Sequence, residues 1–305
     1  MERTFDMVDL RTHLTEEGLE QELRRLIYNI ASTSKYISSK INEANRKLAS
    51  TSNIYGEQQL ELDKAADKIL FERFKHSKLV KTFASEEQGE LRTFEGTGKY
   101  SVTVDPLDGS SLVDVNLAVG TIVGIHEGGL VMGGEKNLIA AMYILYGPLT
   151  TLVYTAKKGV HEFVLNPEGE FILAQPNIRM KERGKIYSPG ALKKDWTEAH
   201  AKYIDFLEKE GFKLRYSGGF VPDINHVLLK KGGLFTYPAL KENPNGKLRL
   251  LFELEPMALI ITQAGGLATD GVNDILSIDV KDIDQRAPVY IGSKFEVEKA
   301  KEFLG

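Results

Sequence analysis

The chain has 305 residues, 42% of them hydrophobic, with 39 Lys+Arg against 43 Asp+Glu and a formal net charge of −4. This length predicts two domains or one large α/β unit, and the balanced charge argues against a protein that binds nucleic acid or membranes through clustered cations. Cysteine is absent, which excludes disulfides and Cys-ligated metals, and no run approaches the roughly 18 apolar residues of a membrane span, so we expect a soluble, cytoplasmic protein.

The N-terminal part is predicted to be helical. Apolar residues recur at helical spacing over 15–44, with Thr15 as a candidate N-cap, and a second helix is predicted over 57–76. The polar stretch 47–56 between them is typical of a loop.

The remainder alternates strands and helices. Strands are predicted first at 100–104, 120–125, 138–146, 150–154 and 161–165. From about 186, strands at 185–187, 213–216, 233–237, 247–252, near 268 and 288–291 are interspersed with helices at 195–210, 222–231 and 256–264. The pattern indicates two α/β layers that meet near 180–186.

The segment 105–111, Asp-Pro-Leu-Asp-Gly-Ser-Ser, carries the clearest chemistry. It leaves a predicted strand and ends in small residues whose backbone amides can hold an anion. The proline lets Asp105 and Asp108 face one side, and carboxylates with carbonyl oxygens suit Mg²⁺, which would activate a bound phosphate toward water. Taken alone, the segment can also be a turn with solvated aspartates.

Other polar residues are informative only in combination. Glu86 and Glu87 form an acidic pair in a predicted loop, Glu253 closes the predicted strand 247–252, and Asp63 lies on the helix face away from the apolar residues. Each of them alone is explained as an ordinary surface residue. The residues with side chains suited to a phosphate are Arg215, Tyr216, Tyr237, Lys247 and Arg249, each of which alone is also explained as a surface charge or a half-buried tyrosine.

These motifs together resemble the class I fructose-1,6-bisphosphatase family, which includes sedoheptulose-1,7-bisphosphatases. The resemblance covers nearly the whole chain and includes SEE at 85–87, DPLDGSS at 105–111, RYSGG at 215–219 and PNGKLRLLFELEPMA at 244–258. It implies a layered α/β/α/β/α sandwich of two domains, 1–185 with the metal-binding motifs and 186–305 with the sugar-bisphosphate site.

The resemblance also implies roles for single residues. Metal ligands would be Glu86, Glu87, Asp105, Asp108 and Glu253 with the carbonyl of Leu107, for two or three Mg²⁺ ions, with Mn²⁺ or Zn²⁺ as alternatives. Catalytic roles would belong to Asp63, Glu87 and Glu57. Substrate would be bound by Asp108, Gly109, Ser110, Ser111, Arg215, Tyr216, Tyr237 and Lys247. Arg215 would reach a neighbouring site in a homotetramer or homodimer.

The implied reaction is Mg²⁺-dependent hydrolysis of the 1-phosphate of fructose 1,6-bisphosphate, a step of gluconeogenesis. Ser188–Leu192 and RYSGG are similar to sedoheptulose-bisphosphatases, whereas Tyr237 is similar to the fructose enzymes, so a dedicated sedoheptulose-1,7-bisphosphatase is the alternative. An inositol-monophosphatase-like enzyme and a non-catalytic sugar-phosphate sensor are further alternatives.

Lys99 and Tyr100 match the family's nucleotide-effector pair. The G-E-L-T turn that accompanies this pair is replaced by Gln-Glu-Leu-Arg at 21–24, so a glycine amide and a threonine hydroxyl are lost.

Overall fold

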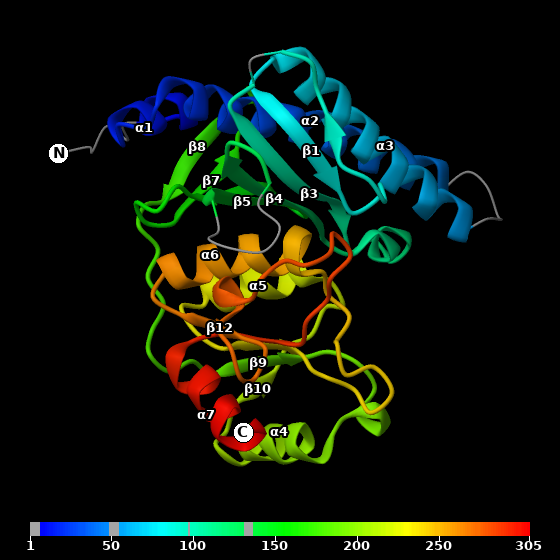
Figure 1. Cartoon of the computed structure of the whole chain (residues 1–305), viewed down its shortest axis with the longest axis vertical. Helices are drawn as coiled ribbons and strands as arrows, with labels where there is room; N and C mark the ends of the chain where they lie inside the picture. Colours follow the sequence, from blue (N-terminus) through cyan, green and yellow to red (C-terminus); the bar gives the residue numbers. More distant parts are fainter. Residues whose placement is uncertain (1–6, 49–54, 97, 131–136) are drawn as a thin grey trace.

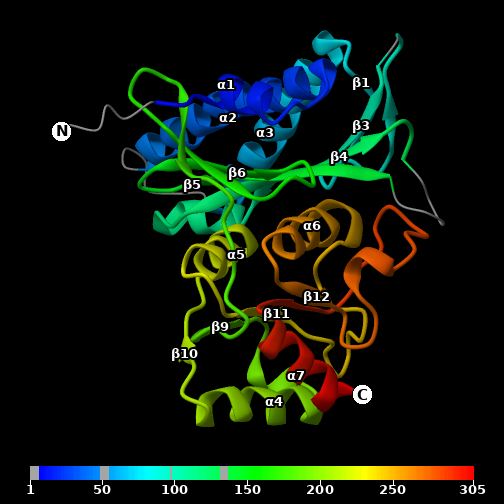
Figure 2. The ribbon, with the colours of Figure 1, turned by 90° about the vertical axis from the view of Figure 1, so that its left-hand side faces the viewer.

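The computed structural model describes residues 7–48, 55–96, 98–130 and 137–305, and within these ranges the side chains of 44–48 and 55–60 are not described. Layers alternate in the order helix, sheet, helix, sheet, helix (Figures 1 and 2). The α/β/α/β/α sandwich expected from the sequence is therefore confirmed. In the described ranges, no helix combines the length and the apolar character needed to cross a membrane.

The first sheet has eight strands in the order β2-β1-β3-β4-β5-β6-β7-β8, with only β1 and β3 running parallel. Its strands are β1 (Val80–Ser85), β2 (Arg92–Thr93), β3 (Tyr100–Asp108), β4 (Val119–Glu127), β5 (Leu138–Tyr146), β6 (Thr150–Thr155), β7 (His161–Leu165) and β8 (Phe171–Gln175). One face is covered by α1 (Leu10–Glu16), α2 (Gln21–Leu48) and α3 (Tyr55–Ser77).

The second sheet has five strands in the order β10-β9-β11-β13-β12. Its strands are β9 (Ile186–Pro189), β10 (Lys213–Leu214), β11 (Leu234–Tyr237), β12 (Leu267–Thr269) and β13 (Val289–Gly292). Between the sheets lie α5 (Phe220–Leu229) and α6 (Glu255–Gln263), and the outer face is covered by α4 (Glu198–Lys209) and α7 (Lys294–Leu304).

Burial on both faces explains why β3 lacks the alternation of an amphipathic strand. All nine of its residues are buried, because α3 packs on one side and the segment leading into α6 on the other. Asp105 and Asp108 are therefore carried into the interior by a strand that is buried along its whole length.

The first predicted helix, 15–44, is wrong in its start. Two helices are present, because Gly18 adopts a left-handed φ of 64° that ends α1, and α2 begins only at Gln21. The N-cap of α1 is Asp9, whose Oδ1 accepts from the Thr12 amide at 2.7 Å. Thr15, the predicted N-cap, lies inside α1 and donates its hydroxyl to the Arg11 carbonyl.

The predicted strand 247–252 is also wrong. Residues Leu250–Leu254 form a π-helical turn that leads into α6, and only an isolated bridge joins Arg249 to Arg286. A short apolar run buried on all sides has the same pattern in a strand and in a helix. The sequence prediction omitted β1, β2, β8 and α7, and the predicted loop 47–56 lies largely outside the described residues.

Candidate active site

The acidic pair after β1 lies beside the end of β3 because the two strands are parallel. Ser85 is in register with Val104, and the Glu86 amide donates to the Val104 carbonyl at 2.9 Å. The turn that follows β1 therefore delivers the Glu86 side chain next to Asp105.

Three carboxylates from separate segments converge at this point. One oxygen each of Glu86, Asp105 and Glu253 lies within 4.8 Å of those of the other two. The Glu253 carboxylate is fixed by the Arg249 amide, which donates to its Oε2 at 2.6 Å. Burial and mutual repulsion raise the pKa of all three carboxyls. A divalent cation would relieve that repulsion, so the donor set fits a hard metal ion.

Asp108 is held differently. Its two oxygens accept from the amides of Phe220 and Val221, at 3.1 and 2.6 Å, in the first turn of α5. Burial raises its pKa to about 6 although these amides act against the shift. The described group of carboxylates with mutual 4.8 Å spacing contains neither Asp108 nor Glu87.

The residues after Asp108 form a cradle of backbone amides. Gly109 has a left-handed φ of 73°, and the 3₁₀ turn Ser110–Val115 starts directly after it. A Cβ at position 109 would lie 3.3 Å from the Gly219 Cα, so the close approach of these two segments also favours glycine here.

Asp63 faces this cradle, which corrects its prediction as a solvated helix residue. The Ser110 hydroxyl donates to Asp63 Oδ2 at 3.1 Å. Burial, and then the neighbouring charge of Glu87, raise the Asp63 pKa to about 7. Asp63 can therefore hold or release a proton near neutral pH.

A cavity of about 320 Å³ joins these groups to a cationic and aromatic wall. Lys247, Tyr216, Tyr237 and Arg286 line the same cavity as the carboxylates, and Lys247 Nζ lies 5.7 Å from the Tyr237 ring centre. Leu107, Gly109, Ser110 and Ser111 also line the cavity. The sequence prediction did not include Arg286, whose guanidinium donates to the Lys247 carbonyl; the QRAPVY segment gave no local signal for it.

Two predicted residues, Arg249 and Arg215, are not among the described residues that line this cavity, and a third, Glu57, has no described side chain. Arg249 belongs with the carboxylates, since its Nε lies 3.3 Å from Glu86 Oε1, and it also pairs with Asp284. Arg215 is exposed and donates to the Leu214 carbonyl at 2.7 Å. Glu57 belongs to α3, but its side chain lies outside the described residues.

The candidate effector pair, Lys99 and Tyr100, lies at the start of β3, about 26 Å along the strand from Asp108 at roughly 3.3 Å per residue. Lys99 Nζ and the Tyr100 hydroxyl both donate to Glu20 Oε2, at 2.6 and 3.0 Å. A carboxylate of this chain thus already occupies the two donors that an anionic effector would use.

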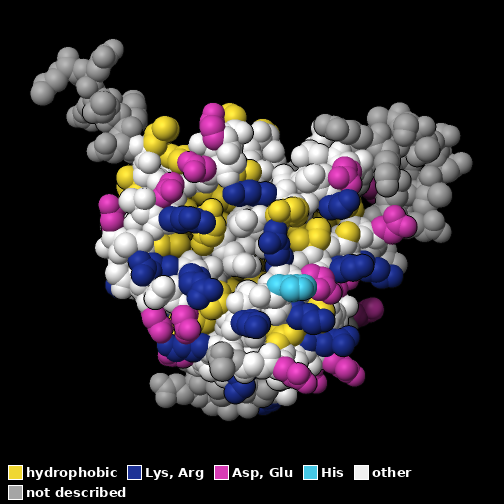
Figure 3. Space-filling view, turned by 90° about the horizontal axis from the view of Figure 1, so that it is seen from above, with side chains coloured by type: hydrophobic (Ala, Val, Ile, Leu, Met, Phe, Trp, Pro, Cys, Tyr) yellow, Lys and Arg dark blue, Asp and Glu magenta, His cyan; other side chains and the backbone are white. Residues whose placement is uncertain are grey.

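A larger cavity of about 570 Å³ opens among the three N-terminal helices. Arg11, Arg24, Arg25 and Arg73 are among its lining residues, which include no carboxylate, and Lys and Arg side chains are spread over this face (Figure 3). Its lining includes none of the carboxylates or of the residues 109–111 that line the smaller cavity.

Comparison with known proteins gives a consistent result. Family models described as the N-terminal and C-terminal domains of fructose-1,6-bisphosphatase match residues 4–176 and 180–305. A class 1 fructose-1,6-bisphosphatase of Geobacter sulfurreducens is 52% identical over 305 residues, 99% of this chain and 97% of the relative. One from Pelobacter propionicus is 51% identical, covering 99% and 94%. The solved holo form of Leishmania major fructose-1,6-bisphosphatase superposes with a TM-score of 0.88 at 31% identity, covering 97% of this chain and 99% of that one.

Proposed function

The chain belongs to the fructose-1,6-bisphosphatase family, and we propose that it hydrolyses the 1-phosphate of fructose 1,6-bisphosphate to fructose 6-phosphate and inorganic phosphate. Identity of 52% to a class 1 enzyme over nearly both full lengths supports this reaction, as part of gluconeogenesis. The observation that carries the proposal is one cavity that joins a carboxylate cluster and an amide cradle to Lys247 and Tyr237.

Magnesium is the proposed ion, held by Glu86, Asp105 and Glu253, with Asp108, Glu87 and the Leu107 carbonyl completing the ligand set. A metal bound there would supply Lewis-acid polarisation of the phosphate and offset its charge. The raised pKa values of the buried carboxyls support this assignment, because their ionised forms are unfavourable without a cation.

The reacting phosphate would bind the amides of Gly109 and Ser110, with Ser111 at the edge of the cradle. Asp63, together with Glu87, would orient the attacking water and accept its proton, for which a pKa of about 7 is suitable. The Ser110 hydroxyl, which donates to Asp63, would keep this carboxylate beside the phosphate. A role for Glu57 in catalysis stays a prediction.

The distal phosphate would bind Lys247, Tyr216, Tyr237 and Arg286. An ammonium, a guanidinium and two phenols supply donors and positive charge for a phosphate dianion. Arg215, exposed near the end of β10, would extend into a neighbouring subunit's site in a homo-oligomer. A cytoplasmic location stays a prediction. We propose domain limits of 1–185 and 186–305, which fall between β8 and β9.

Sedoheptulose 1,7-bisphosphate is a second candidate substrate because the Ser188–Leu192 and RYSGG segments are similar to sedoheptulose-bisphosphatases. The first of these segments packs behind the substrate wall, because a Cβ at Gly190 would lie 2.3 Å from Tyr237 Cδ2. This segment would therefore influence the substrate through the position of the Tyr237 ring.

Phosphate release with Mg²⁺, measured for both bisphosphates and for inositol 1-phosphate, tests the proposal. We expect kcat/KM for fructose 1,6-bisphosphate to exceed that for the seven-carbon sugar by more than about tenfold, roughly 1.4 kcal/mol of transition-state binding. A reversed ratio would identify a sedoheptulose enzyme. Equal turnover of inositol 1-phosphate would indicate an inositol-type enzyme, and no turnover of any substrate would indicate a non-catalytic sensor.

A further inference from the structure

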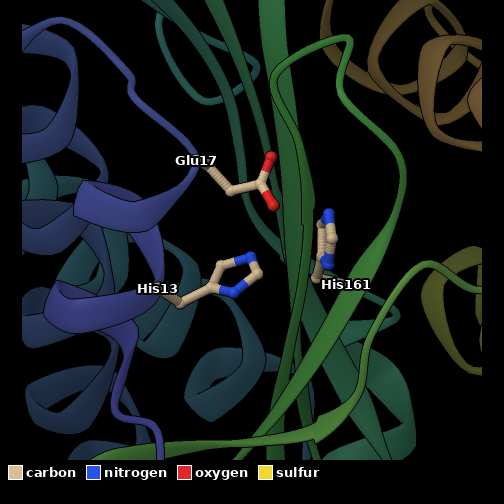
Figure 4. A group of neighbouring side chains, drawn as sticks. All are labelled: His13, Glu17 and His161. Atoms are coloured by element: carbon tan, nitrogen blue, oxygen red, sulfur yellow. The ribbon is translucent and has the colours of Figure 1, made fainter.

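A second group of metal-ligand side chains lies between α1 and β7, away from the active site (Figure 4). His13 and Glu17 are four residues apart, one helical turn, at the end of α1, and His161 is the first residue of β7. One potential ligand atom of each lies within 4.8 Å of those of the other two. Figure 4 shows the three side chains directed into the same space between helix and strand.

This space contains buried polar atoms that lack partners. His13 is 6% exposed, and its Nε2 has no hydrogen-bond partner among the described residues. The hydroxyl of Tyr154, a residue 2% exposed, is also unpartnered there, and the Tyr154 ring centre lies 5.9 and 5.6 Å from those of His13 and His161. Buried polar groups are rarely left unpaired without a ligand or a functional reason.

The donor types select the class of ion. Two imidazoles and one carboxylate suit Zn²⁺ and its neighbours in the transition series, whereas Mg²⁺ prefers oxygen ligands and water. Burial, and then the nearby His161, lower the pKa of His13, which keeps this imidazole neutral and able to bind a metal near pH 7. The carboxylate of Glu17 would offset part of the charge of the ion.

The surroundings also orient the third ligand. His161 Nδ1 accepts from the Asn177 amide at 3.2 Å, and its Nε2 lies 3.3 Å from the Lys158 carbonyl. A ring N–H that donates to a backbone carbonyl, as Nε2 can to Lys158, commonly fixes the ring of a metal-binding histidine. Coordination would then use Nδ1 and would displace its hydrogen bond from the Asn177 amide. Tetrahedral zinc needs ligand atoms roughly 3.3 Å apart, closer than the 4.8 Å limit that these atoms meet, so binding would draw the three side chains together.

We propose that His13, Glu17 and His161 form a zinc-type site that links α1 to the first sheet. His13 and Glu17 lie in one segment and His161 in another that is far away in sequence, so a bound ion would join the N-terminal helix to β7 as a cross-link. The site is separated from the carboxylate cluster by the strands between β3 and β7, about 19 Å at roughly 4.8 Å per strand. Its expected effect is therefore on the stability of the N-terminal layer.

Titration of the full-length protein with Co²⁺ and Zn²⁺, in excess Mg²⁺, tests the site. Visible absorption of bound Co²⁺ reports nitrogen ligation, and thermal melting reports stabilisation by Zn²⁺. The test variants are His13→Phe, which keeps an aromatic ring, and Glu17→Gln, which keeps the shape of a half-buried side chain. The controls are His200→Phe, a buried histidine elsewhere, and Asp105→Asn in the active site.

We expect the parent protein and both controls to bind one Co²⁺ with a visible band and to melt higher with Zn²⁺. His13→Phe and Glu17→Gln should lose more than about tenfold in affinity. The proposal is overturned if both variants bind like the parent, if the parent shows no band, or if the band disappears only in Asp105→Asn. Should His13→Phe fail to fold, Glu17→Gln alone decides.

Discussion

Asp108 offers the sharpest test of how the active site is charged. In the absence of metal, burial raises its pKa from 3.8 to about 6 in the folded protein. The folded state holds this proton more tightly than the unfolded chain, so protonation of Asp108 stabilises the folded protein. This contribution is fully present below the unfolded pKa and is lost as the pH rises through the folded pKa. This rise in pKa corresponds to about 3 kcal/mol of unfolding free energy, of which roughly 1.3 kcal/mol is lost between pH 5 and pH 7.

The substitution Asp108→Asn removes this titration, and it also removes the repulsion by which Asp108 raises the pKa of Glu86, Asp105 and Glu253. This second effect has the same sign, so the change due to Asp108 alone is the smallest expected. The amide oxygen cannot accept from both Phe220 and Val221 as the carboxylate does, so the variant carries a pH-independent cost of about 1–3 kcal/mol. The informative quantity is therefore the difference between parent and variant as a function of pH. Background titrations, such as that of His200, whose pKa burial lowers to about 3, cancel in this difference.

Urea unfolding followed by the fluorescence of the single tryptophan, Trp196, provides the measurement. With a chelator, the free energy of unfolding of the parent relative to Asp108→Asn should fall by about 1.3 kcal/mol from pH 5 to pH 7. With saturating Mg²⁺ the difference should be flat, because a cation favours the ionised carboxylate in the folded protein. A flat or rising difference in the chelator refutes the argument from burial, and an unchanged slope with Mg²⁺ refutes a metal beside Asp108.

Further predictions concern both ends of the cavity. Asp105→Asn should reduce Mg²⁺-dependent phosphate release by at least about a hundredfold yet raise the melting temperature in chelator, because folding raises the pKa of this carboxyl and an amide carries no such ionisation cost; retained turnover would exclude Asp105 as a ligand. Lys247→Met should raise KM for fructose 1,6-bisphosphate by about tenfold or more, and Lys247→Arg should recover part of it; an unaltered KM contradicts the distal site. Gly190→Ala should push the Tyr237 ring aside and weaken substrate binding, while Gly89→Ala, with no atom within 4 Å of the added Cβ, should not; matching kinetics of the two variants would refute this contact.

The cradle was predictable because its chemistry is local. Asp105, Asp108 and Gly109 lie in one short segment, and the order carboxylate, proline, carboxylate, glycine predicts a turn without knowledge of distant contacts, although that segment alone does not distinguish an anion site from solvated aspartates. Many of the strands were predictable for the same reason, since a long strand such as β5 carries its own pattern of β-branched and aromatic residues.

The remaining site residues depend on contacts between distant segments. Glu86 reaches Asp105 only because β1 pairs in parallel with β3, and β1 itself was not predicted. Asp63 is on the polar face of its helix, which suggests solvent, but Ser110 of the 3₁₀ turn covers that face. Arg249 has the side chain of a phosphate ligand, yet the π-helical turn directs it to Glu86. In each case the residue type indicated the chemistry, but the sequence did not indicate which residue it would contact.

Asp108 also explains how the two halves of the molecule share one site. It ends β3 in the first sheet, yet both of its oxygens bind amides at the start of α5, a helix of the middle layer that also contacts strands of the second sheet. Gly120 of β4 reinforces this junction, because a Cβ there would lie 2.5 Å from the Val221 side chain. The left-handed Gly109 directly follows this anchored residue, so a shift of α5 would move the amides proposed to bind the phosphate. The position of the C-terminal half is thereby coupled to the geometry of the cradle by one carboxylate.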